Sequence, residues 1–86
     1  MASVYFAQLG EAGPIKIGAS GDVRARLVQL QTGAPFELRL LGVFPGGEES
    51  EGMFHRWFAY LRLRGEWFSP APELLAVIAA FAEGQP

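Results

Sequence analysis

Hydrophobic and polar residues alternate at the start of the chain in the pattern of a β-hairpin. Residues 3–9 are rich in β-branched and aromatic side chains, and a turn-forming cluster with two glycines and a proline follows at 10–14. Residues 15–18 then predict a return strand. Because side chains alternate along a strand, Tyr5 and Lys16 are expected on one face. The opposite, apolar face comprises Val4, Phe6, Ile15 and Ile17.

The next two segments predict a helix and a strand. Asp22 is an expected N-cap, and apolar residues follow it at the i, i+4 and i+7 spacing of a helix with one buried stripe. That stripe consists of Val23, Leu27 and Leu30. The helix is expected to end near Gly33, because glycine commonly follows a helix end. Residues 36–44 are mostly apolar and predict a third strand.

The remainder of the chain predicts two more helices. From Glu48 a helix is expected to run to Gly65, with an aromatic face. This face is formed by Phe54, Trp57, Phe58 and Leu61, and with Trp67 it is expected in the core. Residues 67–68 allow a short extended piece before a last helix over residues 74–81. The pattern predicts a single α+β domain over residues 1–86, with a small three-stranded antiparallel sheet flanked by three helices.

Composition narrows the classes of function. The 86 residues have room for one small core, and 50% of them are apolar, so that core needs no metal or disulfide. The chain has no cysteine, which excludes a disulfide framework, a zinc ribbon and a cysteine nucleophile. A net charge of -2 argues against binding nucleic acid by bulk electrostatics. No signal sequence or membrane span is recognised, so we expect a cytoplasmic protein that does not bind membranes.

Six polar residues are candidates for chemistry, and each also has an ordinary structural explanation. Tyrosine and lysine on a strand are usual at a partly wet face, and arginines are usual on the solvent side of a helix. Acidic residues stabilise a helix N-terminus, and one histidine four residues after a glutamate is weak evidence for a metal. At 100° per residue, His55 shares a helix stripe with Glu51 and Arg62. The six candidates are Tyr5, Lys16, Arg24, Arg26, Glu51 and His55.

The order and spacing of these residues resemble the GIY-YIG endonuclease superfamily. Val4-Tyr5-Phe6 stands at the place of its first motif, and Lys16-Ile17-Gly18 at the place of its second. The closer likeness is to a phage and fungal subgroup with an I-K-I-G second motif. The subgroup hallmarks read here as Ile15-Lys16-Ile17-Gly18, Arg26, Leu30-Gln31-Thr32-Gly33, Glu51 with His55, and Gly65-Glu66-Trp67-Phe68. The likeness extends from Val4 to about Ile78, and a late polar position that is often asparagine in the superfamily has no clear match.

The resemblance implies catalytic roles for Tyr5, Lys16, Arg26 and His55. Tyr5 would be the general base or would orient the attacking water, which requires its pKa to be lowered, with Lys16 as the nearby cation. Arg26 would grip phosphate oxygens, with Lys16 and the weaker Arg24 as further substrate contacts. His55 would orient water or the leaving group. Glu51 would hold one Mg²⁺ or Mn²⁺.

The resemblance therefore predicts a metal-dependent endonuclease that cuts DNA, with RNA not excluded as a substrate. With no appended DNA-binding module in this sequence, we expect low specificity, a homodimer, or a protein partner that supplies specificity. One alternative is a module that keeps the fold and binds nucleic acid or protein without catalysis. Another is a small phage or mobile-element protein that contacts a host factor through Glu48 and Glu49.

Overall fold

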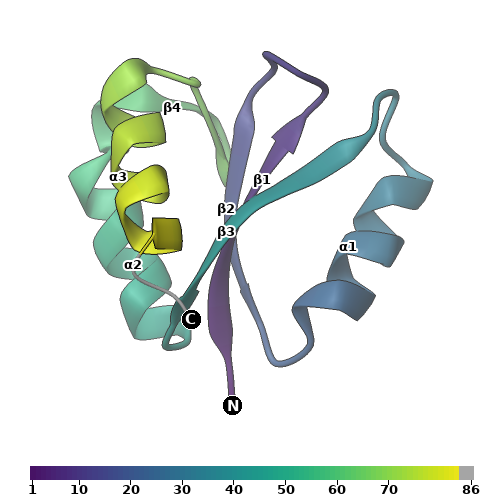
Figure 1. Cartoon of the computed structure of the whole chain (residues 1–86), viewed down its shortest axis with the longest axis horizontal. Coiled ribbons are helices and arrows are strands. Elements are labelled where there is room, and N and C mark those ends of the chain that lie inside the picture. The colour runs from purple at the N-terminus through teal and green to yellow at the C-terminus, as the bar shows by residue number, and fades with distance from the viewer. Residues whose placement is uncertain (84–86) are drawn as a thin grey trace.

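The computed structural model describes residues 1–83 and has an α+β architecture, as the sequence predicts. A five-stranded antiparallel sheet separates one helix from two others (Figure 1). The elements in chain order are β1 (Ser3–Leu9), β2 (Ile15–Ser20), α1 (Val23–Thr32), β3 (Leu38–Pro45), α2 (Glu48–Trp57), a single 3-10 turn η1 (Ala59–Leu61), β4 (Arg62–Arg64), β5 (Trp67–Phe68) and α3 (Pro72–Glu83).

The sheet has the strand order β3-β1-β2-β5-β4, so the predicted three-stranded sheet is too small. The two additional strands form a short hairpin around Gly65, whose φ of 55° lies in the left-handed region that favours glycine. β5 pairs with only the first part of β2, placing Ile15 opposite Phe68 and Lys16 opposite Trp67. The rest of β2 extends beyond the end of β5.

The helix predicted from Glu48 to Gly65 is wrong in its second half. α2 ends at Trp57, η1 follows, and the chain is extended from Arg62. The residues 62–64 alternate between arginine and leucine, which is a period of two and favours a strand. The aromatic residues before it continue a helical period, so the two patterns predict different structures for residues 62–64. Pairing with β5 stabilises the strand.

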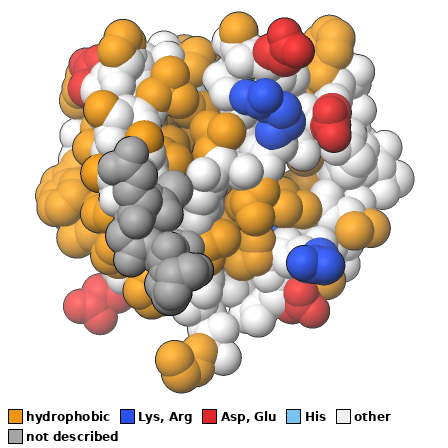
Figure 2. Space-filling view, viewed as in Figure 1, with side chains coloured by type: hydrophobic (Ala, Val, Ile, Leu, Met, Phe, Trp, Pro, Cys, Tyr) orange, Lys and Arg blue, Asp and Glu red, His pale blue; other side chains and the backbone are white. Residues whose placement is uncertain are grey.

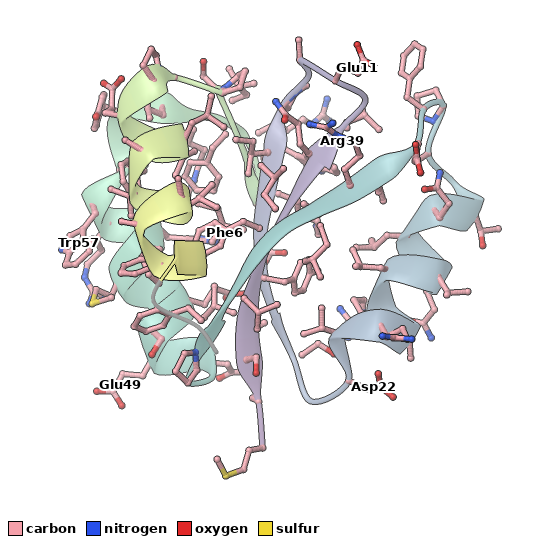
Figure 3. The ribbon with its side chains drawn as sticks, viewed as in Figure 1. Phe6, Glu11, Asp22, Arg39, Glu49 and Trp57 are labelled. Atoms are coloured by element: carbon pink, nitrogen blue, oxygen red, sulfur yellow. The ribbon has the colours of Figure 1, made fainter. Side chains whose placement is uncertain are left out.

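The core lies between the sheet and the helices α2 and α3. Phe6 points from the sheet into this layer (Figure 3), with the rest of the predicted apolar face of the hairpin. The cluster comprises Val4, Phe6, Ile15, Ile17, Phe54, Phe58, Phe68, Leu74 and Ile78. Trp57 is 56% exposed and projects away from the sheet, so its predicted place in the core is wrong. Its ring packs at a steep angle against Phe54, with ring centroids 5.6 Å apart.

The opposite face of the sheet is covered by α1. The Asp22 carboxylate accepts a hydrogen bond from the Ala25 N–H at 3.0 Å, which confirms the predicted N-cap, and Gly33 is the C-cap. None of the α1 residues is fully buried, although its predicted apolar stripe is half-buried. Hydrophobic side chains predominate on the side shown in Figure 2. Within residues 1–83, no helix is long and apolar enough to cross a bilayer.

Candidate active site

Beyond the end of β5, the edge of β2 that faces away from β1 is contacted by side chains instead of a neighbouring strand. The Ile17 N–H donates to the Glu66 backbone carbonyl at 3.0 Å, at the end of the β5 pairing. Just beyond it, the His55 imidazole lies 2.8 Å from the Ile17 carbonyl oxygen. The carboxylate of Glu51 accepts a hydrogen bond from the Ala19 N–H. Two residues one turn apart on α2 are thus fixed against the edge of the sheet.

The two contacts of His55 define its protonation state. A carbonyl oxygen only accepts hydrogen bonds, so Nε2 next to Ile17 carries the proton. A guanidinium only donates, so Nδ1, 3.1 Å from an Arg62 nitrogen, is unprotonated. The Phe68 ring packs edge-on against the imidazole, with ring centroids 5.0 Å apart. The hydrogen-bond partners therefore favour the tautomer of His55 with the proton on Nε2, and they fix the orientation of the ring.

Glu66, in the β4–β5 turn, brings a second carboxylate to this place. One ligand atom from each of Glu51, His55 and Glu66 lies within 4.8 Å of the others. Metal–oxygen and metal–nitrogen bonds of about 2.1 Å place neighbouring ligand atoms roughly 3–4 Å apart, so small side-chain movements bring these three around one cation. Two carboxylates and an imidazole suit Mn²⁺ as well as harder cations. The residues present therefore fit a divalent metal ion.

Tyr5 lies on the α1 face of the sheet, as predicted, and its side chain is 1% exposed. It is paired with Gly18, and a Cβ atom built on that glycine would lie 2.5 Å from the Tyr5 hydroxyl oxygen. The glycine of the second motif therefore leaves the space in which the phenol lies. Arg26 reaches the same hydroxyl from α1 and acts on it both as a positive charge and as a hydrogen-bond donor.

The pKa of Tyr5 is raised above its ordinary value of 10.0, contrary to the expectation that it is lowered. Burial is the main cause, and the negative charge of Glu66 and then of Glu51 adds to it, while Arg26 opposes it. These electrostatic interactions also connect Tyr5 and Arg26 with the carboxylates at the β2 edge. Charged groups from α1, α2 and the β4–β5 turn thus act on the Tyr5 hydroxyl of β1.

Lys16 does not serve as the cation that lowers the pKa of Tyr5. Its ammonium lies 3.2 Å from a Glu66 carboxylate oxygen and 5.3 Å from the centre of the Trp67 ring. The hairpin register explains this, because Lys16 is opposite Ala7 and Trp67, whereas Tyr5 is opposite Gly18. Lys16 is therefore an ion-pair partner of Glu66, and Arg26 is the cation that acts on the phenol.

Arg24 lies apart from the other five candidates. It lines a hollow beside α1 with Leu27, Gln31 and Leu38, on the side toward β3. Two residues on a helix are separated by about 200°, so Arg24 and Arg26 cannot both face the same group. The predicted phosphate contact through Arg24 has no support from this geometry.

The carboxylate of Glu51 is partly withdrawn from water. Its pKa is raised, first by burial and then by the negative charge of Glu66, and the Ala19 N–H opposes the shift. The negative charge of Glu66 beside the Glu51 carboxylate is unfavourable unless a cation lies between them. The ammonium of Lys16 partly meets this need at Glu66.

Two residues of this site are not among the candidates from the sequence. Glu66 lies in the G-E-W-F segment that resembles the family, and this position in a motif is the feature of the sequence that points to a function. Arg62 was noted on a helical stripe with Glu51 and His55. Its contact with His55 is real, but it comes from a strand instead of a helix.

Comparison with known protein families places the chain in a domain family. Among curated proteins and among solved structures, none is significantly similar to this chain. The T5orf172 domain matches residues 2–82, which span all the elements and the whole candidate site. The chain therefore belongs to the T5orf172 domain family, a domain of nuclease-like phage and bacterial proteins related to GIY-YIG and HNH-type endonucleases.

Proposed function

We propose that this protein is a metal-dependent endonuclease of GIY-YIG type that hydrolyses phosphodiester bonds in DNA with low intrinsic sequence specificity. The observation that carries the proposal is the meeting of a buried phenol, a guanidinium and two carboxylates in one site. Tyr5 and Arg26 lie on the α1 face of the sheet, and Glu51 and Glu66 lie at the adjoining edge.

In this proposal, each residue of the site meets a different requirement of phosphodiester hydrolysis. The planar guanidinium of Arg26, exposed at the surface of α1, suits two non-bridging oxygens of one phosphate. The Tyr5 hydroxyl, held beside Arg26, would orient the attacking water, and only its deprotonated form, the phenolate, would accept the proton of that water. When bound, a divalent cation neutralises the carboxylates that raise the pKa of Tyr5 and stabilises the charge that develops on the phosphate. Lys16, whose ammonium lies 3.2 Å from a Glu66 oxygen, would supply a second positive charge for the phosphate.

The donor set bears on which cation is used. Mg²⁺ is normally held by carboxylates and waters, whereas Mn²⁺ also accepts imidazole. Glu51 and Glu66 suit either ion, and His55 adds to the affinity for Mn²⁺ only. We therefore expect both Mg²⁺ and Mn²⁺ to support cleavage, with Mn²⁺ effective at lower concentration.

A second candidate function is a module that binds nucleic acid or protein without catalysis. It is favoured by the raised pKa of Tyr5, which keeps the phenol protonated at neutral pH. The same residues without metal would still present Arg26 and Lys16 to a phosphate backbone.

Cleavage of supercoiled plasmid at low salt with Mg²⁺ or Mn²⁺ distinguishes the two functions. We expect the wild-type protein to nick the plasmid, and Tyr5→Phe, Arg26→Ala and Glu51→Ala to lose activity by at least about a hundredfold each. Arg39→Gln is the matched control, because Arg39 donates to Gln8 at 3.4 Å, away from the site.

Folding of each variant is checked by circular dichroism and thermal unfolding. If the folded wild type and its variants are equally inactive on DNA and RNA, the endonuclease proposal fails and the binding module remains. If RNA alone is cut, the chemistry stands and the proposed substrate is wrong.

A further inference from the structure

Two neighbouring groups determine which ring nitrogen of His55 carries the proton. The Ile17 carbonyl oxygen, 2.8 Å from Nε2, requires a proton there, and the Arg62 guanidinium, 3.1 Å from Nδ1, requires a lone pair there. The lone pair that a metal ion would need is therefore already used by a cationic side chain.

Arg62 is held at this place by weak contacts. Its guanidinium donates to a neutral nitrogen and lies 5.5 Å from the centre of the Phe68 ring. Among the side chains that the structure describes, no carboxylate lies within 4.0 Å of it. The residue is exposed on the edge strand β4. A guanidinium without a carboxylate partner, at the surface beside a candidate nuclease site, is free to exchange its contact for an anion.

Ligation of a cation by His55 is incompatible with the Arg62 contact at either ring nitrogen. If the cation binds Nδ1, it takes the lone pair that Arg62 uses and places a second positive charge beside the guanidinium. If the cation binds Nε2, the ring proton moves to Nδ1, where a group that only donates cannot bind. Arg62 must leave His55 in both cases.

We propose that Arg62 couples metal binding to substrate binding: it competes with the divalent cation for His55, and the cation frees its guanidinium for a phosphate of the nucleic acid. This inference rests on the proposed function. It adds Arg62 to the substrate-binding residues. It also predicts that the protein without nucleic acid binds the metal weakly, because the cation must displace Arg62 from His55. Metal and substrate should then each strengthen the binding of the other.

The first test is the affinity for Mn²⁺ without nucleic acid, measured by calorimetric titration. Removing the competitor in Arg62→Ala should tighten Mn²⁺ binding by about three- to tenfold, the value of a hydrogen bond that no longer has to be broken. Arg62→Gln, which keeps a donor without the charge, should lie between the two. Arg64→Gln is the matched control, because Arg64 is exposed on the same strand. Unchanged or weaker Mn²⁺ binding by both Arg62 variants would overturn the proposal.

The second test reads the imidazole directly, since His55 is the only histidine in the chain. At a pH of about 8, where an ordinary histidine is neutral, the ring nitrogen chemical shifts should show a proton on Nε2 and a bare Nδ1. In Arg62→Ala the Nδ1 shift should move while the Nε2–H signal remains. A proton on Nδ1 in the wild type would refute the competition.

The third test concerns the released side chain and uses the Tyr5→Phe protein, so that the DNA stays intact. We measure the affinity of this protein for a short duplex with and without saturating Mn²⁺, and repeat the measurement with Arg62→Ala added. The increase caused by Mn²⁺ should be several-fold larger in the protein that retains Arg62. An equal metal effect with and without Arg62 would overturn the substrate role. Because these three measurements do not depend on cleavage, they distinguish a failure of this inference from a failure of the nuclease activity.

Discussion

The position of the Tyr5 hydroxyl depends on the missing side chain of Gly18. A methyl group there would lie 2.5 Å from the hydroxyl oxygen and 2.6 Å from the ring carbon that bears it, so the buried phenol would have to move. We expect Gly18→Ala to destabilise the protein by about 1–3 kcal/mol and to lower plasmid cleavage at least tenfold. Thermal unfolding and a cleavage assay measure the two effects.

Gly21→Ala is the control, because its added Cβ would meet no atom within 4 Å. It should keep both stability and activity close to those of the wild type. If Gly18→Ala cleaves as well as Gly21→Ala does, the hydroxyl is not required at this position.

The charges around Tyr5 can be read from its own titration. The chain has two tyrosines, and Tyr60→Phe leaves the near-ultraviolet phenolate absorbance to Tyr5 alone. The midpoint should lie above the ordinary 10.0, because burial and Glu66 raise the pKa. Glu66→Gln should lower the midpoint and Arg26→Gln should raise it. A shift of the same sign in both variants would mean that these charges do not act on Tyr5.

The N-terminal turn of α2 carries a carboxylate that is placed for function at a cost in stability. The pKa of Glu51 is raised above its ordinary value of 4.5 by burial and by Glu66. Between that value and the raised value, the folded state binds more protons than the unfolded state, so stability falls as pH rises. Glu51→Gln should therefore unfold roughly 1–4 °C higher than the wild type at neutral pH without metal.

The pH dependence separates this effect from others. The difference between Glu51→Gln and the wild type should close as pH falls below 4.5, where the wild-type carboxyl is protonated as well. Glu49→Gln is the control, since Glu49 is exposed in the same turn. A lower melting temperature for Glu51→Gln at neutral pH would show that the Ala19 hydrogen bond outweighs the cost of burial.

At the scale of elements, the sequence predicts those parts whose local signals agree. The β1–β2 hairpin, the Asp22 cap and the start of α3 each have a hydrophobic period and a turn or cap residue that point to the same element. The end of α2 was missed because Trp57 continues a helical spacing that the tertiary structure does not use. The hairpin β4–β5 pairs with β2 and buries Phe68 in the core, and no local sequence pattern indicates these long-range contacts.

The family motifs name some residues of the proposed site from the sequence alone, whereas other residues can be named only from the fold. The positive charge of Arg26 and the negative charge of Glu51 both act on Tyr5, which supports the single site that we propose for them. Glu66 and Arg62 join it only because β5 stops after two residues and leaves the rest of β2 open to side chains. Because the sequence pattern predicts a helix that runs to Gly65, it does not place Arg62 and Glu66 at the proposed site.

The whole molecule is acidic, so its contacts with nucleic acid must come from a few well-placed basic residues. It has seven lysines and arginines, and of these Lys16, Arg26 and Arg62 contact residues of the site. About three phosphate contacts give a slope of roughly −3 for the logarithm of DNA affinity against the logarithm of salt concentration. We expect this slope for Tyr5→Phe with Mn²⁺, measured by fluorescence anisotropy.

Single substitutions test whether the contacts are local. Adding Arg26→Gln should reduce the slope by about one and weaken binding at every salt concentration, because one counterion fewer is released. Adding Arg39→Gln removes the same charge from the molecule, but at a position where the side chain lies over β1 and β3, beside Gln8 (Figure 3). Its slope should stay unchanged. If both variants reduce the slope equally, the protein binds through its overall charge, and the site described here does not contact the phosphate backbone.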